Sequence, residues 1–195
     1  MGKLVVSEFM SLDGVIEDPG GAENYAHGGW SFRFPAPDAE QYKFDEVKAS
    51  DVQLLGRVTY EEFAANWPGM EEAMGEFGAL MNNMPKVVVS TTLTDPTWKN
   101  TTVISENVAD EVAALKERHE GDVLVAGSAT LAQFLREHDL VDEYRLIVYP
   151  LVLGDGKRLF SNGPAPTDLE LVESRNVGPD VLLLVYRPAR KDASS

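Results

Sequence analysis

Apolar positions along the chain follow two alternating patterns. Short apolar or alternating runs predict β-strands, and they fall at residues 3–11, 52–55, 86–90, 102–104, 122–126 and 143–149. Helical spacing or helix-start signals fill most of the intervals, at residues 38–49, 59–65, 70–84, 107–119 and 128–138. Two more strand-like runs, 169–177 and 181–186, flank a Gly178-Pro179-Asp180 turn and predict a hairpin.

The order of these elements indicates the fold class. Strands alternate with helices up to about residue 149, which is typical of a mostly parallel sheet that helices cover on both faces. The final hairpin adds antiparallel strands at one edge. No repeat, low-complexity stretch or change of composition divides the chain. We therefore expect a single α/β domain over residues 1–190, followed by a frayed tail at 191–195.

Local signals predict several helix boundaries. Asp38 is a candidate N-cap for the first helix. Pro68-Gly69 is expected to end the helix that starts at Thr59. Residues 70–84 carry four methionines and predict a separate, loosely formed helix. Those methionines are expected to fill core space or to form a partner surface.

Residues 17–37 form a long segment rich in glycine and proline that nevertheless carries Tyr25, Trp30, Phe32 and Phe34. Loops of this length inside a compact domain are usually functional or mobile. The aromatic residues predict either a lid over a ligand or anchors that fix the segment to the body of the domain. The sequence leaves both possibilities open.

Composition and charge narrow the function. The chain has 195 residues, of which 32 are acidic and 17 basic, and its formal net charge is −15. This charge argues against nonspecific binding to nucleic acid or to anionic membranes, because both are themselves negatively charged. The absence of cysteine excludes disulfides, thiolate nucleophiles and cysteine-ligated metals. No apolar run approaches the roughly 18 residues of a membrane span, and no signal segment is apparent, so we expect a cytoplasmic protein.

The turns after the strands carry the candidate chemistry, because ligands of open α/β sheets bind beyond the carboxyl ends of the strands. Three such turns are small and polar: Gly56-Arg57-Val58-Thr59, Ser90-Thr91-Thr92 and Gly127-Ser128-Ala129-Thr130. Helix N-termini offer free N–H groups, glycine permits close approach, and Arg57 adds charged donors. Together these turns predict a polyphosphate site, although glycine after a strand is also common in α/β folds without one.

Other chemistries have less support in the sequence. The three histidines, His27, His119 and His138, lack the paired spacing of metal ligands, so we expect no metal site. His119 and His138 fall late in predicted helices, where a cation favours the helix dipole. There is no G-x-S-x-G elbow, no G-x-G-x-x-G fingerprint and no P-loop.

Four segments, taken in order along the chain, resemble the dihydrofolate reductase-like superfamily. They are Met10-Ser11-Leu12-Asp13-Gly14, Gly56-Arg57-Val58-Thr59-Tyr60, Lys86-Val87-Val88-Val89-Ser90 and Gly127-Ser128-Ala129-Thr130. The resemblance is closest to the reductase domain of bacterial riboflavin-biosynthesis deaminase-reductases and to its stand-alone relatives. Residues 151–160 resemble the late glycine loop of that domain.

This resemblance implies a dihydrofolate reductase-like three-layer fold, NADPH as cofactor, a small-molecule substrate and a homodimer. The residues that it assigns to the cofactor are Gly56, Arg57, Val58 and Thr59 for the phosphates, Ser90 and Thr91 for the 2′-phosphate end, Gly127, Ser128, Ala129, Thr130 and Leu131 for the pyrophosphate, and Asp13 and Gly14 beside the nicotinamide.

Candidate substrate and catalytic residues also follow from the resemblance. Trp30 and then Asp38 are similar in layout to the tryptophan loop and helix acid of dihydrofolate reductase, although the loop here is longer. Asp38 would hydrogen-bond a ring nitrogen or assist its protonation, and Asp13 is the second catalytic candidate. Trp30 and Tyr60 are the candidate substrate contacts. Because cysteine is absent, a role in riboflavin synthesis would require a separate deaminase.

We therefore expect an oxidoreductase that moves hydride from NADPH to a pterin, a pyrimidine or another imine-type small molecule. The alternative is a non-catalytic nucleotide-binding sensor or interaction module on the same scaffold, because a fold does not by itself fix a function. Turnover in the presence of NADPH distinguishes the two.

Overall fold

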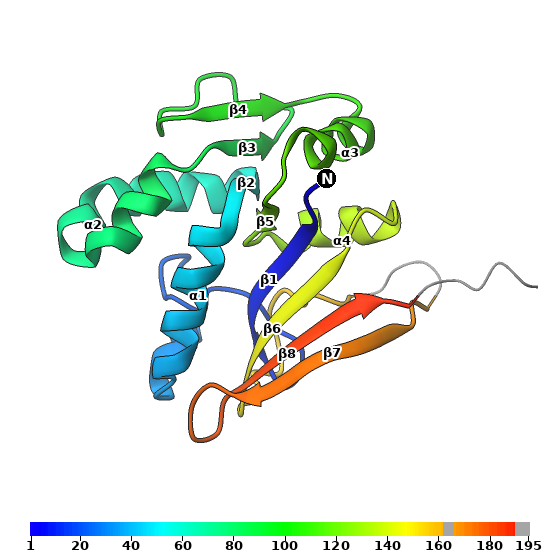
Figure 1. The fold of residues 1–195 in the computed structure, drawn as a ribbon. Helices are drawn as coiled ribbons and strands as arrows, with labels where there is room; N and C mark the ends of the chain where they lie inside the picture. The colour runs from blue at the N-terminus through cyan, green and yellow to red at the C-terminus, as the bar shows by residue number, and fades with distance from the viewer. Residues whose placement is uncertain (162–165, 190–195) are drawn as a thin grey trace, which may run out of the picture.

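The computed structural model describes residues 1–161 and 166–189 and shows one sheet with helices packed on its two faces (Figure 1). The tail predicted to fray, residues 191–195, lies outside the described residues. None of the described helices is both long enough and apolar enough to cross a membrane.

The sheet of the described residues has eight strands in the order β4-β3-β2-β5-β1-β6-β8-β7. The first six in this order are parallel, whereas β8 is antiparallel to β6 and β7 is antiparallel to β8. Their bounds are β1 Leu4–Ser11, β2 Ser50–Gly56, β3 Lys86–Val89, β4 Thr101–Ile104, β5 Asp122–Val125, β6 Glu143–Tyr149, β7 Leu169–Asn176 and β8 Leu182–Pro188. The predicted mostly parallel sheet with an antiparallel C-terminal hairpin is confirmed.

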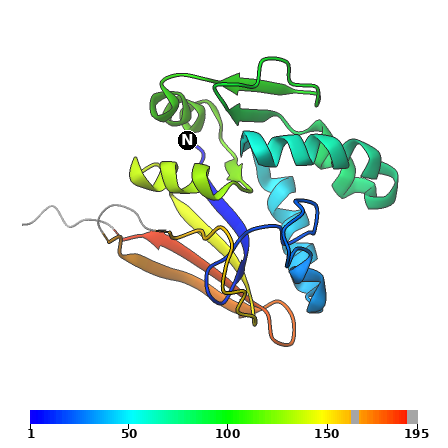
Figure 2. The same ribbon diagram turned by 180° about the vertical axis from the view of Figure 1, so that it is seen from behind.

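Two helices cover each face of the parallel part (Figures 1 and 2). They are α1 Pro37–Ala49 and α2 Arg57–Asn83 on one face, and α3 Val108–Arg118 and α4 Ala129–Glu137 on the other. Alternation along β1 produces this division, because successive side chains of a strand point to opposite faces. Val5 packs with the α1 and α2 side chains, whereas Leu4 and Val6 pack with those of α3 and α4.

Helix α2 corrects one predicted boundary. Pro68-Gly69 does not end the helix, which continues to Asn83 and bends at Gly75, where φ is +56°. This left-handed conformation is one that glycine adopts at little cost. Phe63 and Met81, on either side of the predicted break, belong to the same core cluster. Packing of both parts on one face of the sheet therefore outweighs the local Pro-Gly signal.

The start of α1 corrects a second prediction. Ala36 occupies the N-cap position without a side-chain hydrogen bond, and Pro37 is the first helical residue. Proline suits this place because its missing N–H would have no partner there. Asp38 follows in the first turn, where its charge complements the helix dipole. Asp38 is thus a residue of the first turn and not the cap.

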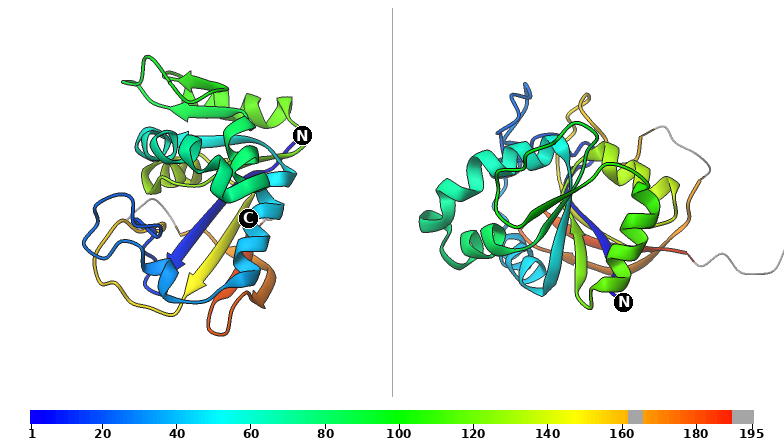
Figure 3. Two further views of the ribbon diagram at one scale, coloured as in Figure 1. Left: turned by 90° about the vertical axis from the view of Figure 1, so that its left-hand side faces the viewer. Right: turned by 90° about the horizontal axis from the view of Figure 1, so that it is seen from above.

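The sheet order brings the candidate turns to one edge. Strand β2 lies between β3 and β5, and all three are parallel. The segments that follow these strands therefore leave the sheet on the same side, at the carboxyl ends of the strands. In the left view of Figure 3, the segment after β1 and the segment after β6 run side by side. An isolated bridge between Val15 and Arg158 joins these two segments.

Candidate functional site

The turns after β2 and β5 are in direct contact. A Cβ atom placed on Gly56 would lie 2.5 Å from Ser128 Oγ, and one placed on Gly127 would lie 2.8 Å from Thr59 Oγ1. Real Cβ atoms do not approach other atoms so closely, so a side chain at either position would force the neighbouring hydroxyl group to move. Gly127 also has a φ of +78°, which independently favours glycine. The two predicted phosphate turns therefore form one continuous surface.

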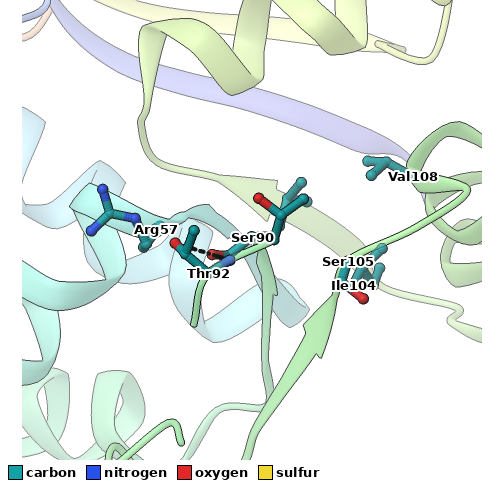
Figure 4. Close-up of a pocket in the computed structure, with 8 residues that line it drawn as sticks. Arg57, Ser90, Thr92, Ile104, Ser105 and Val108 are labelled. Atoms are coloured by element: carbon teal, nitrogen blue, oxygen red, sulfur yellow. Dashed lines mark hydrogen bonds between the residues drawn. The ribbon is translucent and has the colours of Figure 1, made fainter. Parts of the chain in front are cut away.

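The third turn joins this surface through a pocket of about 290 Å³. Figure 4 shows Ser90 and Thr92 in the middle of it, with Arg57 on one side and Ile104 and Ser105 on the other. Ser90 Oγ accepts hydrogen bonds from the N–H groups of Thr92 and Leu93, at 3.1 and 3.0 Å, and so shapes the turn. The complete lining is Arg57, Val89, Ser90, Thr91, Thr92, Ile104, Ser105 and Val108.

Arg57 stands at the mouth of this pocket with 42% of its side chain exposed. Its guanidinium group donates hydrogen bonds of 2.7–2.8 Å to both carboxylate oxygens of Glu61, one helical turn later. This pair holds the arginine near the pocket at a surface where the net energy of an ion pair is small, roughly 0–1 kcal/mol. An incoming anion can therefore compete with Glu61 for the guanidinium at little cost.

The N-terminus of α4 supplies further donors. Ser128 is the N-cap, and its Oγ accepts the N–H of Leu131 at 3.4 Å. Among the described hydrogen bonds, none occupies the N–H groups of Ala129 and Thr130, as is usual in the first turn of a helix. The side chain of Leu131 is buried in the core, whereas Val58 is exposed on α2.

Glu8 was not singled out in the sequence, yet it lies at the centre of this edge. The residue is 8% exposed, and its Oε1 accepts the N–H of Gly127 at 2.7 Å. Burial raises the pKa of Glu8 to about 7, although the Gly127 N–H and the Lys43 ammonium favour the ionised form. The only sequence signal was a charged residue inside an otherwise largely apolar strand.

Asp13 links the segment after β1 to the loop after β6. Its carboxylate accepts hydrogen bonds from Ser11 Oγ, from the N–H groups of Leu153 and Gly154, and from the Arg158 guanidinium, at 2.7–3.1 Å. Burial works to raise the pKa of Asp13, but the bonds from Ser11, Gly154 and Leu153 outweigh it and hold the pKa well below its usual range. A carboxylate so fully engaged fits a positioning role better than proton transfer.

The aromatic substrate candidates lie in the core. Trp30 has no exposed surface; its Nε1–H donates to the Glu17 carbonyl at 2.8 Å, and its ring meets Tyr149 edge-on. Tyr60 is also buried, and its hydroxyl accepts the N–H of Trp98 at 3.0 Å. Trp30 thus anchors the 17–37 segment to the body. Asp38 is exposed on α1, so the structure does not gather Trp30, Tyr60 and Asp38 around one open space.

The 17–37 segment lies against α2 and the loop after β6. Lys157 Nζ pairs with Glu17 at 2.8 Å and lies 3.8 Å from Glu23. Burial, reinforced by the nearby Glu23 carboxylate and a hydrogen bond with it, raises the pKa of Glu62 on α2 to about 7. Acidic groups from β1, α2 and the 17–37 segment therefore interact electrostatically.

Known proteins share this architecture. A structure from Shewanella sp. PV-4 with a provisional riboflavin-biosynthesis name has a TM-score of 0.75 and 22% identity, covering 97% of this chain and all of that one. Dihydrofolate reductase from Enterococcus faecalis, complexed with NADP(H), has a TM-score of 0.59 and 16% identity, covering 97% and 98%. These likenesses confirm the predicted dihydrofolate reductase-like fold.

Sequence comparison gives the family. The uncharacterized protein YyaP of Bacillus subtilis (strain 168) is 27% identical over 186 residues, which is 94% of each chain. The sequence model of the RibD C-terminal domain matches residues 2–183, nearly the whole chain. The chain therefore belongs to the RibD C-terminal domain family.

Proposed function

We propose that this protein is an NADPH-dependent reductase of a small molecule with a C=N bond, such as a pterin or an aminopyrimidine. The observation that carries the proposal is the junction of three donor-rich turns along one edge of the sheet. The turns after β2 and β5 touch, and Arg57 joins them to the pocket beyond β3 and β4.

The donors along this edge fit the charge distribution of NADPH. The 2′-phosphate would lie in the pocket, against Arg57, Ser90 and Thr91, where serine and threonine hydroxyls and a guanidinium are the available donors. The diphosphate would lie on the Gly56–Thr59 and Gly127–Thr130 turns, at the N-terminus of α4. Each charge-assisted hydrogen bond contributes roughly 1.5–3 kcal/mol, enough to hold a polyanion on a chain of net charge −15.

The reacting end would lie towards β1, bordered by Asp13 and Gly14. When bound, NADPH supplies a hydride ion. The chain's own task is to orient the two reactants, exclude water and provide a proton to the reduced nitrogen. Asp38 remains a proposed substrate contact on α1. The Enterococcus enzyme and the Shewanella protein support the proposal through fold alone.

Calorimetric titration of NADPH and NADH into the wild type and Arg57→Ala tests the proposal. We expect NADPH to bind more tightly than NADH. Arg57→Ala is expected to weaken the affinity for NADPH at least tenfold and to change the affinity for NADH little. Arg118→Ala, at the far end of α3, is the matched control because Arg118 is also exposed and paired with a glutamate. Equal affinity for both nucleotides would contradict a 2′-phosphate pocket.

Turnover completes the test. Oxidation of NADPH in the presence of a panel of pterins and aminopyrimidines is expected to identify a reducible substrate. Tight NADPH binding with no oxidation by any member of that panel would instead favour the non-catalytic nucleotide sensor. The affinity measurement and the turnover measurement thus address separate parts of the proposal.

A further inference from the structure

Glu8 accepts a hydrogen bond from the N–H group of Gly127, which would otherwise be available to the diphosphate. Its Oε1 accepts the N–H of Gly127, the first residue of the turn that leads into α4. Among the described residues, no hydrogen bond is made to its second oxygen, Oε2, and Oε2 is not among the buried side-chain atoms that lack a partner, so this oxygen reaches solvent although the residue as a whole is more than nine-tenths buried. A carboxyl group with one unpaired oxygen thus lies directly beside the proposed diphosphate surface.

This arrangement conflicts with an ionised Glu8. A diphosphate carries negative charge, and a like charge within roughly 4–6 Å disfavours ionisation of a carboxyl group. The low dielectric of a buried position strengthens this repulsion. A neutral carboxyl removes the conflict, since its Oε1 still accepts the Gly127 N–H and its remaining O–H is a donor for an anionic or polar ligand.

The other charged groups around Glu8 do not remove the conflict. Lys43 of α1 offers the opposite charge, but its Nζ already donates to Ser7 Oγ and to the Glu46 carboxylate. Glu46 of α1 and Glu23 of the 17–37 segment both disfavour a charged Glu8. Burial is the largest cause, and the two carboxylates add to it, so that the free protein holds the pKa of Glu8 at about 7 and a further anion would raise it.

We propose that Glu8 must be protonated for a diphosphate-bearing nucleotide to bind at the Gly127–Ser128 turn, so that binding takes up one proton at this carboxyl group. The inference rests on the proposed function, which it deepens by making cofactor affinity depend on pH.

Calorimetry in buffers with different heats of ionisation tests the uptake directly. At pH 7.5 the wild type is expected to take up more than half a proton on binding NADPH, and the affinity is expected to fall up to about tenfold per pH unit above pH 7. NADH is a necessary second ligand, because it lacks the 2′-phosphate, which titrates itself. If the protein takes up a proton on binding NADH as well as NADPH, that proton is bound by the protein and not by the 2′-phosphate.

Glu8→Gln supplies the decisive comparison. This neutral isostere keeps an acceptor for Gly127, so we expect it to bind both nucleotides without proton uptake, with an affinity that varies less with pH, and more tightly than the wild type at pH 8.5. Glu62→Gln is the matched control, because Glu62 is the other glutamate whose pKa is raised to about 7. Uptake lost in Glu62→Gln but kept in Glu8→Gln would overturn the proposal.

A second measurement covers the case in which Glu8→Gln does not fold. Infrared difference spectroscopy of the wild type is expected to show a new protonated-carboxyl band when NADH binds at pH 8. Binding without that band and without proton uptake would refute the role of Glu8 while leaving the proposed function intact. Failure of the wild type to bind either nucleotide at any pH from 6 to 8.5 would instead overturn the proposed function, and this inference with it.

Discussion

Gly56 and Ser128 come from turns that are more than 70 residues apart in sequence, yet a Cβ on Gly56 would lie 2.5 Å from Ser128 Oγ. The backbone at Gly56 has ordinary extended angles, with φ −74° and ψ 156°. The obstacle to a side chain at Gly56 is therefore one of space and not of conformation. The close approach of the two turns is what makes a continuous phosphate surface possible.

The first prediction concerns this contact. Gly56→Ala is expected to lower the free energy of unfolding by about 1–3 kcal/mol, because the extra methyl group overpacks the contact between the two turns. It is also expected to weaken the binding of NADPH, because it displaces Ser128. Urea unfolding and nucleotide titration measure the two effects. Gly69→Ala is the matched control: nothing lies within 4 Å of its added Cβ, and it replaces glycine inside α2. The free energy of unfolding of Gly69→Ala should rise by about 0.5–1 kcal/mol.

A second prediction concerns a buried lysine. Lys86 is 1% exposed, and its Nζ donates to the carbonyls of Asn82 and Met84 at 2.9 and 2.8 Å above the Trp98 ring. Burial, with a smaller effect of Lys99, lowers the pKa of Lys86 to about 8. In the unfolded chain the pKa returns to about 10.4. Between these values the unfolded state binds more protons, so stability should rise with pH.

Urea unfolding from pH 7.5 to 10 checks this sign. Other groups titrate in the same range, so the informative quantity is the difference between the wild type and Lys86→Met. Over this pH range the free energy of unfolding of the wild type should rise by about 1–3 kcal/mol more than that of Lys86→Met. Lys48→Met, at an exposed position paired with Glu76, should keep the wild-type slope. Identical slopes for the wild type and Lys86→Met would refute the prediction.

A third prediction concerns Asp13. Asp13→Asn removes the charge that faces Arg158 and weakens the bonds from the Leu153 and Gly154 N–H groups. We expect a loss of about 1–3 kcal/mol in the free energy of unfolding at pH 7. Because the folded-state pKa of Asp13 lies below the unfolded value near 3.9, its contribution is complete at neutral pH and disappears as the pH falls through and below 4.

Acid unfolding of the two proteins measures that contribution. The curves of wild type and Asp13→Asn should converge at low pH. Asp45→Asn, on the exposed side of α1, should follow the wild type throughout. A constant difference between wild type and Asp13→Asn at every pH would show that the charge of Asp13 is not the source of its effect.

A fourth prediction concerns the homodimer implied by the family resemblance. Strand β7 is the edge of the sheet, and Leu171 and Val172 are exposed on it. An edge strand presents unpaired N–H and C=O groups that a second copy can pair with. The double variant Leu171→Lys/Val172→Lys should therefore be monomeric in light scattering. Phe32→Lys, at an exposed position on Trp30–Arg33, should remain dimeric; a monomeric wild type would refute the expectation.

The meeting of the turns was predictable because parallel strands place their carboxyl ends at one edge. Val87, Val88 and Val123 to Val125 identified buried strands by composition alone, and the glycine and hydroxyl residues after them identified the turns. The pocket residues Ser105 and Val108 escaped notice because they follow β4, whose predicted run was short. No local pattern distinguishes such positions from an ordinary connecting loop.

Tertiary packing decided what the sequence left open. Pro68-Gly69 is a strong local stop signal, but its helix continues because the side chains on both sides of it pack on one sheet face. The role of Trp30 was undecided between lid and anchor, since only the fold supplies its partners, Glu17 and Tyr149. Glu8, next to Ser7, is a polar interruption of an apolar run in the sequence, and only the fold places the N–H of Gly127 against its carboxylate.

The hydrogen bond between Trp30 and the Glu17 carbonyl has an evolutionary consequence. It closes the intervening dozen residues into a loop whose two ends are fixed to the buried body. Within that loop Asp18 is buried and accepts hydrogen bonds from the N–H groups of Ala22 and Tyr25, so its substitution would unfasten the loop itself. Related proteins are therefore expected to vary at the exposed positions of this loop, such as Asn24, Ala26 and His27, and to keep a carboxylate at position 18.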